Sequence, residues 1–201
     1  MFRIGIIGGS RDTARLLRIL LHEKGLTSMI AGGEADDYST EFGMDMAHKD
    51  PYQADIWIER ILNADGSAAH NSPFDILIVN DLAADRQKGS EESVQAARDL
   101  CHDTETGGGA VLVNSDEKEL LQALAGYMDQ GKIITYGLNN RACVTASSIS
   151  DTGVQCCIQR ALPAVSGHTL EQQEFSVQTG QASGDIHGVL AAATAAMLAT
   201  Q

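Results

Sequence analysis

Residues 2–13 read FRIGIIGGSRDT, a short apolar run that reaches a glycine turn and then a polar segment. The run over 2–7 is nearly continuous, which is typical of a parallel strand covered by helices on both faces. A helix is expected to open near Thr13. Its apolar stripe consists of Leu16, Leu17, Leu20 and Leu21. A strand, a glycine turn and a helix in this order predict a phosphate-binding loop.

The glycine turn lacks residues with which a working phosphate loop holds a nucleotide. Working loops end in Gly-Lys-Thr or Gly-Lys-Ser, where the lysine neutralises phosphate and the hydroxyl binds Mg²⁺. Here Arg11 stands at the second glycine position, Asp12 at the lysine position, and Thr13 alone is retained. Because a carboxylate repels phosphate, the sequence predicts a nucleotide-using scaffold whose nucleotide chemistry is impaired.

The same turn also has a structural explanation. A tight strand-to-helix connection needs glycine too, and Ser10 or Asp12 would then cap the helix. The binding hypothesis instead places an anion on the backbone amides of Gly8, Gly9 and Ser10, with Arg11 as a positive group. The absence of the pattern G-x-G-x-x-G argues against a dinucleotide-binding loop.

Up to Gly137 the chain alternates strands with helices. Apolar runs predict further strands over 27–31, 54–62, 75–80, 109–114 and 132–136. Helical patterns cover 13–23, 91–102 and 117–128, and 32–52 is interpreted as a long loop. This order specifies a mainly parallel sheet flanked by helices, the α/β class. We therefore expect a parallel α/β core over residues 1–138.

After Gly137 the pattern changes. Short strand-like runs fall over 143–149, 154–159 and 171–177, with turns between them, which predicts a separate small antiparallel sheet. An alanine-rich helix over 187–198 closes the chain. We expect one domain over 1–201, in which 139–201 holds the small sheet and the closing helix.

Composition narrows the possible partners and compartment. The net charge of −13 argues against nucleic acid and anionic membrane surfaces as partners, since both repel an acidic protein. No apolar run reaches the roughly 18 residues that span a bilayer, and the first residues do not have the pattern of a signal peptide. The four cysteines, without a C-x-x-C pair, predict reduced thiols in a cytoplasmic protein.

The ordered motifs resemble the central domain of the Mur ligase family, which includes folylpolyglutamate synthetase. The matching features are the Gly8 turn, the strand ending at Asn80, AVLVN at 110–114 followed by Ser115-Asp116, ITYGL at 134–138, and the helix after Ile186-His187-Gly188. Members of the family join an amino acid to a carboxylate through an acyl phosphate formed from ATP. The resemblance covers 3–199 and implies a P-loop NTPase-like fold, with ATP and Mg²⁺ as cofactors if the site is active.

The resemblance also assigns candidate site residues. It implies a vestigial nucleotide cleft at Gly8, Gly9, Ser10, Arg11, Thr13, Asn80 and His187, and a Mg²⁺ site at Thr13 and Glu59. The family's lysine is replaced by Asp12, and its two closing-helix asparagines by Gly188 and Ala191. The family's Asp-His pair is replaced by Ala84-Asp85, and its flanking substrate domains are expected to be missing. Because phosphoryl transfer depends on positioned cations, we assign no catalytic residue.

Three classes of function follow from these residues. We expect a non-catalytic binding or assembly protein whose partner is a small ligand or another protein. The alternative is a subunit of an ATP-dependent carboxylate–amine ligase that a partner chain completes. The third class is a structural or regulatory homo-oligomer.

Two candidate sites have simpler explanations. A nucleophilic pair of His187 with Cys143 or Cys156 has no local support in the sequence. Thr13 and Glu59 also have a structural explanation, at a helix start and a strand end, without metal.

Overall fold

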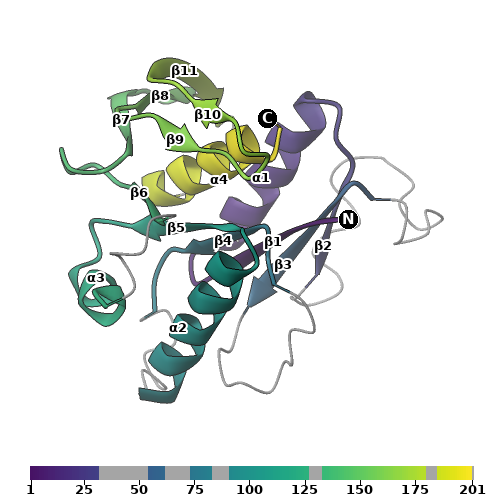
Figure 1. Ribbon diagram of the computed structural model, residues 1–201. Coiled ribbons are helices and arrows are strands. Elements are labelled where there is room, and N and C mark those ends of the chain that lie inside the picture. The colour runs from purple at the N-terminus through teal and green to yellow at the C-terminus, as the bar shows by residue number, and fades with distance from the viewer. Residues whose placement is uncertain (32–53, 62–72, 83–90, 127–132, 180–184, 201) are drawn as a thin grey trace.

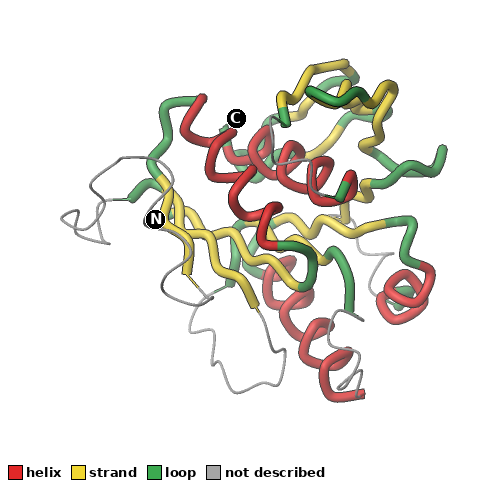
Figure 2. Tube along the Cα trace, turned by 180° about the vertical axis from the view of Figure 1, so that it is seen from behind, coloured by secondary structure: helices red, strands yellow, loops and turns green. Residues whose placement is uncertain are grey.

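The computed structural model describes the chain except for residues 32–53, 62–72, 83–90, 127–132, 180–184 and 201. A single large sheet runs through the molecule, with helices on both of its faces (Figure 1). Helices α1 (Arg11–Glu23) and α4 (Ile186–Ala199) pack together on one face. Helices α2 (Glu91–Thr106) and α3 (Lys118–Leu124) cover the other (Figure 2).

Six parallel strands form the first part of this sheet. They are β1 (Phe2–Ile7), β2 (Ser28–Ala31), β3 (Ile56–Ile61), β4 (Ile76–Val79), β5 (Ala110–Asn114) and β6 (Ile133–Tyr136). Their spatial order is β6-β5-β4-β1-β3-β2, so β1 lies centrally between β4 and β3. The predicted parallel α/β core is confirmed.

The C-terminal strands join the same sheet, which corrects one detail of the prediction. Strands β7 (Val144–Ile149), β8 (Gly153–Ile158) and β11 (Gln173–Gln178) are antiparallel to one another, as expected. They are not a separate sheet, because Tyr136 of β6 pairs with Val144 of β7 and extends the sheet to nine strands. The separate antiparallel sheet is instead β9 (Leu162–Pro163) with β10 (Thr169–Leu170).

Alternating side chains of the central strands divide the core between the two faces. Ile76 and Ile78 pack with α1 and α4, whereas Leu77 and Val79 pack with α2 and α3. Burying one such side chain stabilises the fold by about 1.5–3 kcal/mol. Helix α4 is buried on almost every side, so it connects the two parts of the sheet from within the core.

No described helix is long and apolar enough to cross a membrane.

Candidate functional site

The glycine turn between β1 and α1 is held tightly against the end of β4. Gly8 and Gly9 have positive φ angles of 69° and 80°, which strain any residue with a side chain. A Cβ at Gly8 would overlap the carbonyl oxygen of Asp81, and one at Gly9 would lie 2.6 Å from Nδ2 of Asn80. Close backbone packing is therefore sufficient to explain both glycines.

Helix α1 begins earlier than predicted, at Arg11, so the turn contains only Gly8, Gly9 and Ser10. Ser10 occupies the N-cap position, but its side chain makes no capping hydrogen bond. Asp12 lies in the first helical turn, 3.7 Å from the guanidinium of Arg15. Its carboxylate therefore complements the positive end of the helix dipole, the position that a bound phosphate would otherwise take.

Thr13 faces helix α4. Its side chain is 2% exposed, and its hydroxyl oxygen has no hydrogen-bond partner in the structure. A Cβ at Gly188 would overlap that oxygen, so α1 and α4 are in direct contact here. Ala191, the second position at which the family has asparagine, is fully buried. A small pocket remains beside this contact, lined by Ser10, Asp12, Thr13, Leu16, Asp185, Gly188 and Val189.

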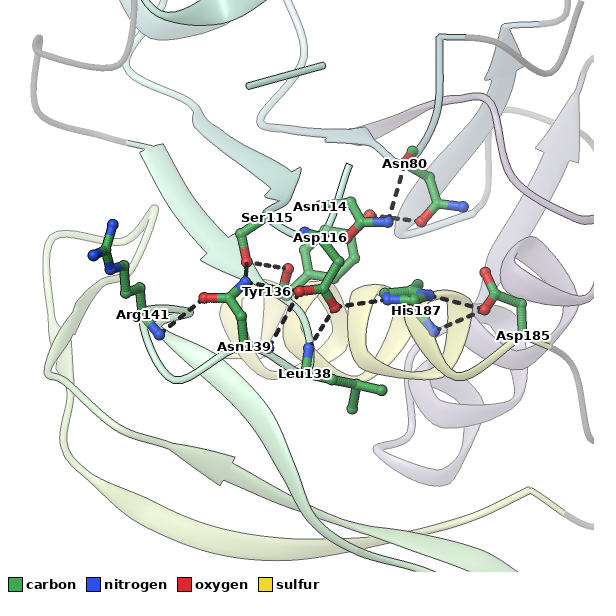
Figure 3. Close-up of polar contacts among 10 residues, drawn as sticks. All are labelled: Asn80, Asn114, Ser115, Asp116, Tyr136, Leu138, Asn139, Arg141, Asp185 and His187. Carbon is green, nitrogen blue, oxygen red and sulfur yellow. Dashed lines mark hydrogen bonds and ion pairs between the residues drawn. The ribbon is translucent and has the colours of Figure 1, made fainter. Parts of the chain in front are cut away.

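Asn80 is part of a buried hydrogen-bond network. Its side-chain oxygen accepts a hydrogen bond of 2.8 Å from the Tyr136 hydroxyl, and its backbone oxygen accepts one of 3.3 Å from the side-chain amide of Asn114 (Figure 3). Burial, with a smaller contribution from the charge of Asp185, raises the pKa of Tyr136 well above its usual value, so Tyr136 stays a neutral donor. The network ties the ends of β4, β5 and β6 together.

His187, in the first turn of α4, lies between two carboxylates. Its Nε2 is 2.8 Å from Oδ2 of Asp116, and its Nδ1 is 3.0 Å from Oδ1 of Asp185 (Figure 3). Asp185 is the N-cap of α4 and also accepts the backbone N–H of His187 at 3.2 Å. Burial lowers the pKa of His187, but its bonds to Asp116 and Asp185 outweigh that effect and raise the pKa above its usual value.

Asp116, in the turn after β5, receives hydrogen bonds from the loop after β6. The backbone N–H groups of Leu138 and Asn139 donate at 2.6 and 3.2 Å, and Nδ2 of Asn139 donates at 2.8 Å. The same Nδ2 lies 2.6 Å from Oγ of Ser115. Burial raises the pKa of Asp116, but these bonds and His187 outweigh it, so the pKa is lowered.

The proposed Mg²⁺ ligands have other contacts in the structure. Glu59, on β3, forms an ion pair of 3.2 Å with Arg3 of β1. The hydroxyl of Thr13 faces Gly188. Across the described parts of the chain, no three His, Cys, Asp or Glu side chains form a group that holds a metal. These contacts favour a structural role for both residues, and the metal site stays a hypothesis. Ala84 and Asp85 lie outside the described residues.

The cysteines have no hydrogen bond to His187, whose ring nitrogens are bound by Asp116 and Asp185. Burial first, and neighbouring groups second, raise the pKa values of Cys101 and Cys156 to about 12, so both thiols stay protonated and unreactive. Half-buried Cys143 has its Sγ 3.4 Å from the Thr135 hydroxyl. The structure gives no support to a cysteine–histidine pair.

The family resemblance assigned His187 and Asn80 to one cleft, but it did not indicate their hydrogen-bond partners Asp116 and Tyr136. Around His187 lies a polar cluster that also contains Asp116, Asn139 and Asp185, three residues to which the sequence assigns no role. Asp185 had a readable signal, because an aspartate directly before a helix start is a common N-cap. The pairing of Asp116 with His187 had none, because the two residues are 71 positions apart.

Comparison with solved structures identifies the fold. UDP-N-acetylmuramoyl-L-alanyl-D-glutamate–2,6-diaminopimelate ligase aligns over 100% of this chain and 44% of its own, with a TM-score of 0.64 and 17% identity. MurF ligase from Thermotoga maritima in complex with ADP aligns over 96% of this chain and 44% of its own, with a TM-score of 0.59 and 13% identity. An FPGS–AMPPCP complex aligns over 98% of this chain and 58% of its own, with a TM-score of 0.58 and 13% identity.

The chain therefore spans 44% to 58% of the length of these proteins. Neither a protein-family model nor a curated protein matches the sequence. At this level of identity the likeness concerns three-dimensional structure, and it extends over both the parallel core and the C-terminal strands. The chain has the Mur-ligase-like fold of the central domain that the Mur ligases and folylpolyglutamate synthetase share.

Proposed function

We propose that this chain is a Mur-ligase-like domain that acts in binding or assembly and does not transfer phosphate from ATP. One observation carries the proposal. Asp12 and Asp185, at the N-termini of α1 and α4, line the same pocket, and none of the pocket's seven lining residues is basic.

Electrostatics explains why these two carboxylates matter. A helix N-terminus attracts an anion through its free N–H groups and its dipole. Here each terminus already has a carboxylate of the chain beside it. Two like charges about 4 Å apart repel by about 1 kcal/mol in water and about 4 kcal/mol near a protein surface. A triphosphate would meet this repulsion at both helices, reduced by the pairing of Asp12 with Arg15 and of Asp185 with His187. A ligand or partner with a cationic group would be attracted.

The neighbouring contacts support the same proposal. The side-chain oxygen of Asn80 is bonded to Tyr136, and the approach of Thr13 to Gly188 leaves no space for the asparagine of the related ligases. In this chain, those residues of the expected nucleotide cleft stabilise the fold.

The proposal is tested by calorimetric titration of the purified chain with ATP and with ADP, each with and without Mg²⁺. We expect no binding tighter than about millimolar, equivalent to about −4 kcal/mol. Asp12→Asn should weaken the repulsion and increase nucleotide affinity. Asp99→Asn is the matched control, because Asp99 is an exposed residue of α2, and it should leave nucleotide affinity unchanged. Micromolar, Mg²⁺-dependent ATP binding by the unmodified chain would overturn the proposal in favour of the ligase subunit.

The assembly component needs a separate measurement. Light scattering over a wide concentration range reports whether the chain associates with itself. Self-association supports assembly as a homo-oligomer. If the chain is a monomer at every concentration, the proposed partner is a different molecule. Titration with a polyamine and with inorganic phosphate then compares a cationic with an anionic ligand. Preference for phosphate over the polyamine would contradict the proposed role of Asp12 and Asp185.

A further inference from the structure

The two bonds of His187 require both ring nitrogens to carry protons. Oδ2 of Asp116 and Oδ1 of Asp185 face Nε2 and Nδ1 at 2.8 and 3.0 Å. An ionised carboxylate only accepts hydrogen bonds, and a neutral imidazole has only one N–H. Neutral His187 would therefore keep one bond and direct a lone pair of electrons at the other carboxylate.

The remaining contacts of the two carboxylates indicate which bond is lost. Asp116 keeps three N–H donors, from Leu138 and Asn139, when the imidazole no longer donates to it. Both described donors to the Asp185 carboxylate belong to His187 itself. Neutral His187 therefore keeps its proton on Nδ1, bonded to Asp185, and the lone pair on Nε2 faces Asp116.

We propose that His187 is a pH-sensitive latch, which holds the start of α4 on the turn after β5 only while its imidazole is doubly protonated. The latch joins segments that are far apart in sequence, because Asp116 is also bonded to the loop at 138–139. When it opens, the first turn of α4 is released from this cluster. That turn includes Gly188, which covers the Thr13 hydroxyl, so the opened latch exposes this contact.

The surrounding charges favour the closed form. On α4 and on the turn after β5, the groups that act on His187 are Asp185 and Asp116, both negative. From α1, Asp12 lines the same pocket as Asp185 and is paired with Arg15. On the loop after β6, the guanidinium of Arg141 points away from His187 (Figure 3).

The pH range follows from the direction of the shift. Because the folded pKa of His187 lies above its ordinary value of about 6.5, the latch contributes fully below that value. Its contribution is lost as the pH rises through the raised pKa. The latch is therefore closed in acid and opens toward alkaline pH.

NMR spectroscopy of the labelled full-length chain tests the latch directly. As the pH rises, the ¹⁵N shifts of His187 should change from the imidazolium to the form protonated at Nδ1. In the same range, amide exchange at Val189 and Leu190, corrected for its intrinsic pH dependence, should accelerate several-fold. A His187 that is already neutral in mild acid, or exchange that stays unchanged through the titration, would overturn the proposal.

Variants separate the latch from general effects of pH. Asp116→Asn removes the charge and supplies an amide that can donate to neutral Nε2, so the step in exchange at Val189 and Leu190 should disappear. His168→Gln is the matched control, because His168 is an exposed histidine in the turn between β9 and β10, and the step should remain. If both variants keep the step, His187 is not its origin. The titration of the unmodified chain gives a result even if a variant does not fold.

Discussion

The hydroxyl oxygen of Thr13 occupies the space in which a Cβ of Gly188 would lie, so that helices α1 and α4 pack closely at this pair of residues. The family resemblance implies an Mg²⁺-binding hydroxyl at Thr13 and an asparagine at the position of Gly188. In this chain the pair forms a helix–helix contact, and the hydroxyl is buried without a hydrogen bond. The geometry makes the pair suitable for mutational analysis.

Gly188→Ala should destabilise the protein, because the new Cβ would overlap the Thr13 oxygen. Overpacking of this kind costs about 1–3 kcal/mol, partly offset by the better helix propensity of alanine. Urea denaturation measures the difference in free energy of unfolding. Gly126→Ala is the matched control, because its Cβ would meet no atom within 4 Å. Adding Thr13→Ala to Gly188→Ala removes the overlapping oxygen and should restore most of the lost free energy of unfolding. A Gly188→Ala protein as stable as the parent would show that this contact is not tight.

Reversing the charge at the start of α1 should increase phosphate binding. Asp12→Lys with Arg11→Gly removes the repelling carboxylate and adds a cation at a helix N-terminus. We expect phosphate affinity to reach about millimolar, worth about 4 kcal/mol, by calorimetry, without recovery of catalysis. Asp99→Asn, which raises the net charge by the same single unit, is the control for the change in net charge. If the double variant folds but binds phosphate no better than the control, the turn from Gly8 to Ser10 does not present its amides to an anion.

Stability should vary with pH through His187 and Asp116 in opposite directions. The raised pKa of His187 means that its contribution is lost as the pH rises through that value. The lowered pKa of Asp116 means that its contribution is lost as the pH falls through that value. Denaturation curves across the pH range should therefore show a maximum between the two. In His187→Gln the alkaline decrease should be smaller, and an unchanged decrease would assign it to another group.

Tyr136→Phe should destabilise the sheet, because the side-chain oxygen of buried Asn80 would lose its donor. An unsatisfied buried polar group costs about 1–3 kcal/mol. Chemical denaturation with and without Tyr136→Phe measures this cost. A loss below a few tenths of a kcal/mol would mean that Asn80 finds another donor.

Thr104→Val is the contrasting case. The Thr104 hydroxyl is fully buried and has no hydrogen-bond partner, and valine has nearly the same shape. The substitution removes a desolvated polar atom without leaving another one unpaired, so it should be neutral or stabilising. A clear loss of stability in the same denaturation assay would indicate that the hydroxyl has a partner, such as a buried water.

The sequence predicted the central strands well, because the runs over 2–7, 75–80 and 109–114 are apolar at almost every position, as strands covered on both faces must be. It did not predict that β7 continues the main sheet. That attachment depends on one residue pair, Tyr136 with Val144, and on the path of the loop between them. Neither the residue pair nor the path of the loop produces a recognisable pattern in the sequence.

The candidate site was predictable only in part. Glycine turns, strand ends and helix starts are local features, so the sequence could mark Gly8, Asn80 and His187 as candidates, and the family resemblance assigned them to one cleft. Their contacts depend on distances between elements. A sequence does not state that Thr13 faces Gly188, or that Asp116 lies 2.8 Å from His187.

The attachment of β7 to β6 has a mechanical consequence. The nine-stranded sheet has a parallel part, β1 to β6, and an antiparallel part, β7, β8 and β11. The two parts are joined by one residue pair, Tyr136 with Val144. Helix α4 packs against strands of both parts, from β4 to β8, and so stabilises the connection between them. We therefore expect denaturant to separate the two parts of the sheet at this pair, with β7, β8 and β11 unfolding together once the packing of α4 is lost.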